Sequence, residues 1–122
     1  MRHAPYQLTM PDRRLTGVVF ASPHSGRDYP TGFLRASLLD ERTIRSSEDA
    51  FVDTLLDGVP SLGAPLIAAT VPRAWLDLNR AADELDPALI EGARLSAHNP
   101  RVASGLGVIP RVVAAGRAIY HG

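Results

Sequence analysis

The feature that most limits the folds open to this chain is a valine-rich apolar run at residues 15–21 that ends in a loop. The run is short and is bounded by charged residues and by Pro23, which is typical of a buried strand. The loop Pro23-His24-Ser25-Gly26 places His24 at the carboxyl end of that strand. Because ligands collect at this edge of open α/β sheets, His24 is a candidate metal ligand. The alternative interpretation is an ordinary histidine in a surface loop.

Apolar periodicity and turn residues predict further strands and helices around this run. The clearest helix begins after Ser47, a typical N-cap residue, and carries an apolar stripe at Phe51, Val52, Leu55, Leu56 and Val59. Residues 65–70 and 74–78 are predicted strands, joined as neighbours by a turn at Val71-Pro72. Residues 32–39 and 83–91 are predicted short helices. Residues 1–14 and 93–107 are expected to be irregular, and residues 108–119 to form an apolar segment broken by Pro110 and Gly116.

Composition excludes several classes of protein. The 122 residues fit one domain, and 13 basic against 13 acidic residues give no net charge, which argues against nonspecific nucleic-acid binding. Because the chain has no cysteine, it cannot form disulfides or thiolate metal sites, and any metal must be bound by His, Asp or Glu. No apolar run is long enough for a signal peptide or a membrane-spanning helix, so a soluble cytoplasmic protein is expected.

A second group of candidate ligands is acidic. Glu48 and Asp49 occupy the first turn of the predicted helix, and Asp53 follows one turn later, so that Asp49 and Asp53 share a helix face. Either Glu48 or Asp49 offers a metal an oxygen ligand, with Asp53 orienting a neighbouring group. The alternative is that these acids only cap the helix and interact with its dipole.

A third group is cationic and polar. Arg73 precedes the sequence Asp77-Leu78-Asn79-Arg80. A guanidinium beside an amide suits a carboxylate, because the planar fork of arginine matches two oxygens. Arg73 is placed to supply positive charge to an oxyanion. The alternative is a surface ion pair of Arg80 with Asp77 or Asp83, which contributes little to stability.

Taken in order, these motifs resemble those of the N-formylglutamate amidohydrolase (N-formylglutamate deformylase) family. They are Pro23-His24-Ser25-Gly26-Arg27, Glu48-Asp49-Ala50-Phe51-Val52-Asp53, Arg73 with Asp77-Leu78-Asn79-Arg80, and Gly105-Leu106-Gly107-Val108-Ile109-Pro110-Arg111 with Tyr120. The resemblance implies an α/β/α sandwich around a mixed sheet, related to zinc carboxypeptidases and aspartoacylases (phosphorylase/hydrolase-like). Family members are about twice as long, so residues 1–122 would be the N-terminal part of a single amidohydrolase domain.

The resemblance also implies a role for each candidate residue. His24 becomes a metal ligand, Asp49 the first choice of acidic ligand and Glu48 the second, and the divalent metal is expected to be zinc. Arg73 becomes the group that polarises the carbonyl, and Asn79 with Arg80 the clamp for the substrate carboxylate. Arg27 and Arg111 are candidates for a second carboxylate. Nothing in the chain matches the family segment that supplies the other metal histidine and the general base.

The implied reaction is hydrolysis of the C–N amide bond of N-formyl-L-glutamate to formate and L-glutamate, an amidohydrolase reaction on a linear amide that belongs to histidine degradation in this family. One alternative keeps the fold and changes the substrate to other N-acyl amino acids. Another is a catalytically inactive truncated remnant that acts as a binding or oligomerisation module. The expected partner is a small dicarboxylate or N-acyl amino acid rather than nucleic acid or a membrane, and exposed sheet edges predict self-association.

Overall fold

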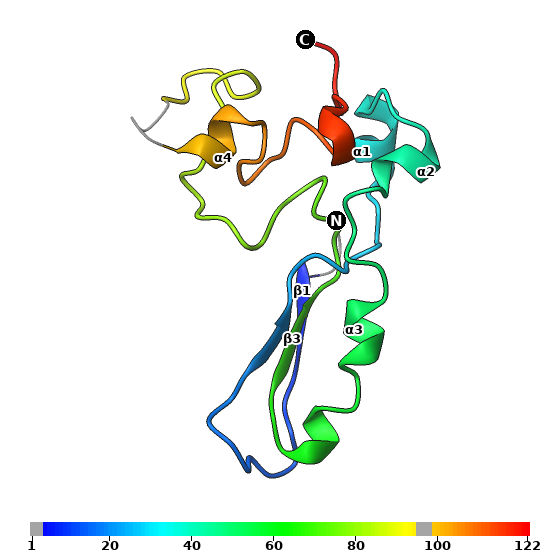
Figure 1. Cartoon of the computed structure of the whole chain (residues 1–122), viewed down its shortest axis with the longest axis vertical. Coiled ribbons are helices and arrows are strands. Elements are labelled where there is room, and N and C mark those ends of the chain that lie inside the picture. The colour runs from blue at the N-terminus through cyan, green and yellow to red at the C-terminus, as the bar shows by residue number, and fades with distance from the viewer. Residues whose placement is uncertain (1–3, 95–98) are drawn as a thin grey trace.

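The computed structural model describes residues 4–94 and 99–122 of the chain (Figure 1). The elements run β1 (Tyr6–Thr9), β2 (Phe20–Ser22), α1 (Thr31–Ala36), α2 (Glu41–Ile44), α3 (Val52–Leu55), the 3₁₀ turn η1 (Pro60–Leu62), β3 (Leu66–Ala69), α4 (Pro100–Ala103) and the 3₁₀ turn η2 (Ala114–Gly116). The molecule is elongated, with the sheet and α3 at one end and α1, α2 and α4 at the other. The chain is therefore an α/β protein in which short elements are joined by long loops.

The three strands form one mixed sheet in the order β1-β3-β2. The central strand β3 pairs antiparallel with β1, so that Tyr6 lies opposite Ala69 and Leu8 opposite Ile67. It pairs parallel with β2, which places Ala21 opposite Ile67. The sheet is mixed, as the family resemblance implies, and β3 confirms the strand expected at residues 65–70.

The strand expected at residues 15–21 is shorter than predicted. Only Phe20–Ser22 pair with β3, and the amide of Phe20 donates to the carbonyl of Pro65 at 2.9 Å. Pro65 has no amide hydrogen to donate in return, so the ladder ends at this residue. Val18 and Val19 are left exposed beside the sheet.

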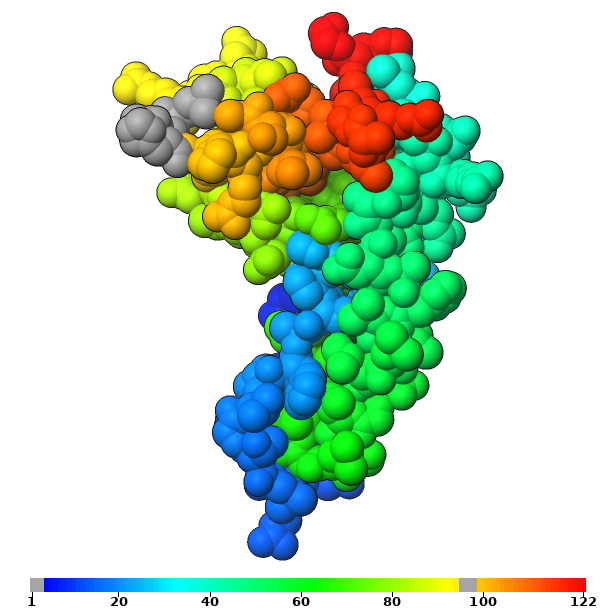
Figure 2. Space-filling model, in the orientation of Figure 1, coloured from blue at the N-terminus to red at the C-terminus, as the bar shows by residue number. Residues whose placement is uncertain are grey.

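The compact core lies at the helical end of the molecule. It consists of Phe33, Ile44, Ala74, Val113 and Ile119, with four partly buried side chains packed around it: Tyr29, Leu39, Trp75 and Tyr120. The C-terminal residues cover this end of the molecule in the space-filling view (Figure 2). The broken apolar segment at 108–119 thus supplies core side chains through a loop, because Ile119 is fully buried although it belongs to no helix or strand.

The helix predicted after Ser47 is largely wrong. Ser47 lies in a turn, Glu48 and Asp49 belong to no helix or strand, and only Val52–Leu55 are helical. The amide of Asp49 donates to the carbonyl of His24 at 2.9 Å, a long-range bond that ties this stretch to the turn after β2. Phe51 then begins α3 with a left-handed φ of 65°. Asp49 and Asp53 therefore do not share a helix face.

Other local predictions also need correction. Residues 74–78 are not a strand, because the amides of Trp75 and Leu76 both bond back to the carbonyl of Pro72 and turn the chain. The lead-in expected to be irregular contains β1, which needs β3 as its partner. Helix α2, capped by Asp40, and α4, capped by Asn99, were not predicted, and residues 83–91 form turns instead of a helix.

The predicted helix at residues 32–39 corresponds to α1 (Thr31–Ala36). Across the part of the chain that the structure describes, no helix has the length and apolar character needed to cross a membrane.

Candidate active site

His24 lies in the turn that follows β2, and contacts with distant segments fix this turn. Its carbonyl accepts the amide hydrogen of Asp49, and the hydroxyls of Ser22 and Ser25 on either side of it are hydrogen bonded at 2.6 Å. The imidazole is buried, with 9% of the residue exposed. The predicted candidate ligand is therefore a buried histidine at the carboxyl end of a strand, not a solvated loop residue.

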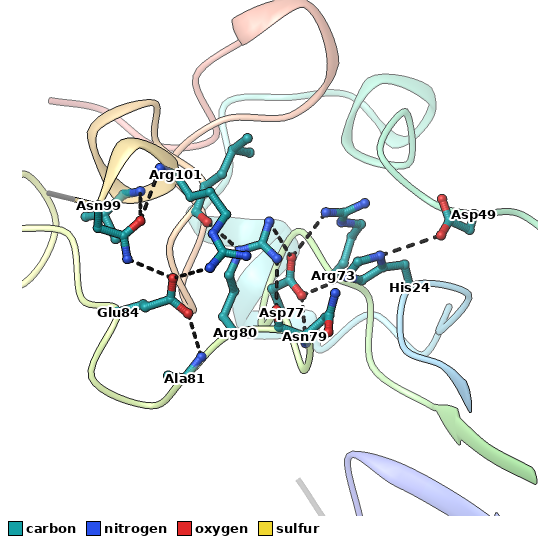
Figure 3. A network of polar contacts seen from close by, with 12 residues as sticks. His24, Asp49, Arg73, Asp77, Asn79, Arg80, Ala81, Glu84, Asn99 and Arg101 are labelled. Carbon is teal, nitrogen blue, oxygen red and sulfur yellow. Dashed lines mark hydrogen bonds and ion pairs between the residues drawn. The ribbon is translucent and has the colours of Figure 1, made fainter. Parts of the chain in front are cut away.

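The buried carboxylate of Asp77 is the centre of the polar network around His24 (Figure 3). His24 Nε2 donates to Asp77 Oδ1 at 2.7 Å, and the backbone amide of Asn79 donates to the same oxygen at 2.9 Å. The second oxygen, Oδ2, lies 3.2 Å from Arg73 Nη2 and 3.8 Å from Arg80 Nη2. Asp77 is 1% exposed. A carboxylate this buried needs several donors to remain charged, and the network supplies them.

The pKa of Asp77 reflects this balance. Burial alone raises the pKa of a carboxyl group, but the hydrogen bonds from His24 and from the amide of Asn79, together with the charge of Arg73, outweigh burial and lower the pKa of Asp77. Asp77 is therefore ionised at neutral pH and accepts hydrogen bonds only. It follows that His24 Nε2 carries a proton.

The protonation of Nε2 leaves Nδ1 as the ring nitrogen that can bind a ligand. In a neutral imidazole with hydrogen on Nε2, the lone pair is on Nδ1. Nδ1 lies 3.5 Å from Oδ2 of Asp49, whose side chain is 53% exposed. A nitrogen donor and an accessible oxygen donor thus face each other, and a buried carboxylate orients the ring from behind, as in many histidine metal sites.

Across residues 4–94 and 99–122, no three His, Asp or Glu side chains converge as a metal site would require. His24 contacts two carboxylates, but through different ring nitrogens, so Asp49 and Asp77 lie on different sides of the imidazole. The described residues therefore offer a metal two donors, one fewer than a catalytic zinc site usually takes from the protein. His3 and His98 lie outside the described residues.

Arg73 and Asp77 line a cavity of about 390 Å³. Its other walls include Ser47, Ser104, Pro110 and Gly116, so the C-terminal loop closes one side. Arg73 keeps 22% of its side chain exposed and makes one ion pair, to Asp77. It is therefore a cation with donors still available to a molecule in this cavity.

Arg80, expected with Asn79 as a carboxylate clamp, is bound mostly by backbone carbonyl groups in the structure. Its Nε donates to the carbonyl of Leu106 at 2.9 Å and its Nη1 to the carbonyl of Asn79 at 2.9 Å. The side chain is only 9% exposed. Most of the guanidinium group therefore holds the loop at Leu106 against the Asp77 network.

The side of Asn79 faces a different cavity. This residue lines a cavity of about 320 Å³ whose walls also include strand residues Tyr6, Ala21 and Ile67.

We expect Arg80→Lys to lower the free energy of unfolding by about 2 kcal/mol, because an ammonium cannot reproduce the forked contacts to Leu106 and Asn79. Urea denaturation measures the effect. The matched control is Arg35→Lys in α1, whose side chain is exposed and whose replacement should change little. Equal effects of the two substitutions would contradict the structural role of Arg80.

Glu48, the second choice of acidic ligand, does not face His24. It accepts hydrogen bonds from the hydroxyl of Tyr29 and from Nε of Arg45, the latter at 2.9 Å, and its side chain is 5% exposed. Burial and the neighbouring Glu48 raise the pKa of Tyr29 far above its usual value. Of the two acids, the structure brings only Asp49 to His24.

The two further arginines also bond elsewhere. Arg27 forms an ion pair with Asp53 at 3.2 Å and lies over the ring of Phe51, at 5.2 Å from the ring centroid. Arg111 donates through Nε to Asp86 at 2.9 Å. Neither contacts the network of Asp77.

Sequence reasoning missed the importance of Asp77, which it treated as a partner in a surface ion pair. The available signal was local: an aspartate two residues before Asn79 favours a side-chain bond to that backbone amide, and Arg73 is four residues before it. What the sequence could not indicate is the contact with His24, which depends on the fold.

Two comparisons place the chain in a class of amide hydrolases. The family model described as N-formylglutamate amidohydrolase matches residues 16–122. The chain belongs to the N-formylglutamate amidohydrolase family, as its motifs indicated. The crystal structure of N-formylglutamate amidohydrolase from Ralstonia eutropha JMP134 is similar, with 38% sequence identity and a TM-score of 0.82. The match covers 97% of this chain and 42% of that chain, so this chain spans less than half the length of the solved enzyme. No curated protein matches the sequence.

Proposed function

We propose that these residues form the N-terminal portion of a metal-dependent amidohydrolase that cleaves N-formyl-L-glutamate to formate and L-glutamate. The observation that carries the proposal is His24, held through Nε2 by the buried Asp77 and facing Asp49 with Nδ1. Family membership supports the type of bond cleaved. The cavity lined by Arg73 and by Asp77, the hydrogen-bond partner of His24, gives an anionic substrate a place to bind.

Nδ1 of His24 and the carboxylate of Asp49 fit a divalent metal such as zinc, which binds nitrogen and oxygen donors. A third protein donor would come from outside the described residues, in keeping with the usual three protein ligands of a catalytic zinc. When bound, such a metal would lower the pKa of water and polarise a carbonyl group. Asp77 keeps the ring of His24 in one orientation and one tautomer for that purpose.

Arg73 is the cation best placed to contact the substrate. It lines the cavity and uses one guanidinium nitrogen on Asp77, so its other nitrogens can donate to a carboxylate or to the oxyanion of a tetrahedral intermediate. Arg80 acts mainly through the loop at Leu106, which it holds in place. Arg80 could join Asn79 in binding the substrate carboxylate only if it gave up its hydrogen bond to the carbonyl of Leu106 or to that of Asn79.

The test is formate release from N-formyl-L-glutamate by a complete enzyme that contains these residues, with metal content measured on the same sample. We expect His24→Ala to reduce kcat/KM by at least about 100-fold and to remove bound metal, because one of few ligands is lost. The matched control is His121→Ala, since that histidine is exposed and lies outside the network. N-acetyl- and N-succinyl-amino acids in the same assay test the broader acyl specificity.

Two results would contradict the proposal. An enzyme that binds no metal and releases neither formate nor another acid from these substrates would favour an inactive binding module. Full activity and unchanged metal content in the His24→Ala variant would remove His24 from the site.

A further inference from the structure

One wall of the cavity that contains Arg73 is a loop. Ser104, Leu106 and Pro110 line this cavity together with Arg73. Residues 104–110 follow α4 and belong to no helix or strand. Because the loop has no strand or helix pairing of its own, its backbone groups bond to neighbouring segments, and those contacts fix the position of the cavity wall.

The middle of the loop lies directly on the backbone of Glu84. The amide of Val108 donates to the carbonyl of Glu84 at 2.9 Å, and the carbonyl of Val108 accepts from the amide of Asp77 at 2.8 Å. A methyl group at Gly107 would lie 2.5 Å from the carbonyl oxygen of Glu84, so the two segments are in close contact. One loop residue therefore joins Glu84 to the buried aspartate of the candidate site.

The side chain of Glu84 holds the start of the same segment, as Figure 3 shows. Its Oε1 accepts from Nδ2 of Asn99 at 2.8 Å and lies 3.3 Å from Nη2 of Arg101, while its Oε2 accepts from the amide of Ala81 at 2.6 Å. The side chain is 11% exposed. Asn99 in turn caps α4, which leads into the loop. Glu84 thus ties α4 to the segment that follows the Asp77 network.

Asp86 holds the other end of the loop. It is 5% exposed and accepts from Nε of Arg111 at 2.9 Å. The amide of Arg111 donates to the carbonyl of Gly105 at 2.8 Å, which closes the loop on itself. Glu84 and Asp86, the acidic clasp, therefore fasten the loop at its start, its middle and its end.

We propose that Glu84 is a positioning residue for substrate binding, which with Asp86 holds residues 104–110 in place as a wall of the cavity beside Arg73. The identity of the substrate, N-formyl-L-glutamate, rests on the proposed function. His24 is held separately, by Asp77 and by the turn that carries it. A displaced wall weakens binding in the ground state and the transition state alike, which raises KM and leaves kcat unchanged.

A reciprocal exchange of side chains tests the clasp. Hydrogen bonds from Asn99 and from the amide of Ala81 lower the pKa of Glu84, so its carboxylate is ionised at neutral pH and only accepts. Glu84→Gln sets an amide group against an amide group. Asn99→Asp sets two carboxylates against each other but keeps the cap of α4, because aspartate caps as well as asparagine. The double variant restores the bond with donor and acceptor exchanged.

The complete enzyme that contains these residues is assayed with N-formyl-L-glutamate, and hydrogen exchange is measured in peptides that span residues 104–111. We expect each single substitution to raise KM at least about tenfold with kcat within about twofold, and to speed exchange in the loop at least about tenfold. Exchange in β3 should not change. The double variant should return KM and exchange to within about threefold of wild type. Glu91→Gln, at an exposed glutamate, is the matched control and should change neither.

Four results would overturn the proposal. Unchanged exchange in the loop would remove the clasp, and faster exchange with an unchanged KM would remove its role in substrate binding. Exchange that rises equally in β3 and in the loop would show a general loss of stability. A double variant as impaired as the two single variants combined would show that Glu84 and Asn99 do not act as a pair.

Failure of the proposed function gives a different pattern. An enzyme that releases no formate from N-formyl-L-glutamate contradicts that function, whereas hydrogen exchange still decides whether the clasp holds the loop. Formate release with unchanged loop exchange in both single variants contradicts the clasp and leaves the proposed function intact.

Discussion

Asp77→Asn should lower the free energy of unfolding by about 3 kcal/mol at neutral pH, one of the two largest effects we expect from a single substitution in this chain. The carboxylate accepts from His24 and the amide of Asn79 and pairs with Arg73 and Arg80 while it is almost fully buried. An asparagine keeps the shape but removes the charge, and its amide hydrogens face the arginines. Two buried or half-buried cations then lose their counter-charge.

The pH dependence of unfolding separates this charge effect from a loss of packing. The pKa of Asp77 is lowered in the folded protein, so its stabilising contribution is complete above the unfolded pKa of about 3.9 and is lost as the pH falls through the lower folded value. Protonated aspartic acid resembles asparagine. The difference between wild type and Asp77→Asn should therefore shrink as the pH falls from 6 toward 3.

Urea denaturation at a series of pH values measures this difference. Asp40 and Glu84 also have lowered pKa values, but they are present in both proteins and cancel in the comparison. Asp83→Asn is the control, because Asp83 is exposed and its replacement should change stability little at any pH. A difference between wild type and Asp77→Asn that stays constant from pH 6 to pH 3 would contradict the charged network.

The sequence was informative where local chemistry decides the structure. Two elements could be predicted from a short stretch of sequence each: the strand β3, from its apolar run, and the helix α1, from its apolar residues. The grouping of candidate site residues also followed from motifs, since His24, Arg73 and the amide of Asn79 meet at the carboxylate of Asp77, and Asp49 faces His24 from the other side of the ring. Those motifs carry family information that periodicity alone does not contain.

The predictions failed where a long-range contact decides the local conformation. Ser47 and the acids after it have the composition of a helix start, but in the structure they lie outside a helix and the amide of Asp49 donates to the carbonyl of His24. The same bond brings Asp49 to the site. The residue that breaks the predicted helix is Phe51, whose left-handed φ of 65° the composition of this stretch does not indicate.

The assignment of the arginines shows a second limit. All four candidates, Arg27, Arg73, Arg80 and Arg111, have the chemistry to bind a carboxylate, and their chemistry alone gives no means of ranking them. In the structure Arg27, Arg80 and Arg111 are engaged by Asp53, Leu106 and Asp86 respectively. Of the four, it is Arg73 that lines the cavity beside Asp77. Selection among similar side chains depends on tertiary contacts that the sequence does not display.

Gly26→Ala should destabilise the chain by about 3 kcal/mol or more, because it forces apart the segments that hold His24 in place. A methyl group at Gly26 would overlap the carbonyl oxygen of Val71 and would lie 2.6 Å from its carbonyl carbon and 2.7 Å from that of Thr70. These are backbone atoms of a fixed segment. The amide of Thr70 donates to Pro5 at 2.9 Å and its carbonyl accepts from Asp28 at 2.9 Å.

The same substitution elsewhere in the chain provides the control. Gly32 lies within α1 and a methyl group there would meet no atom within 4 Å, so Gly32→Ala should stabilise the chain by up to about 1 kcal/mol through helix propensity. Opposite signs for two identical substitutions cannot arise from the general effect of alanine on the unfolded state. Thermal or urea denaturation decides the matter, and a neutral Gly26→Ala would mean that the turn carrying His24 does not pack against Val71. Because that turn also sets the distances from His24 to Asp49 and Asp77, the variant should also weaken the metal binding that we propose for the complete enzyme.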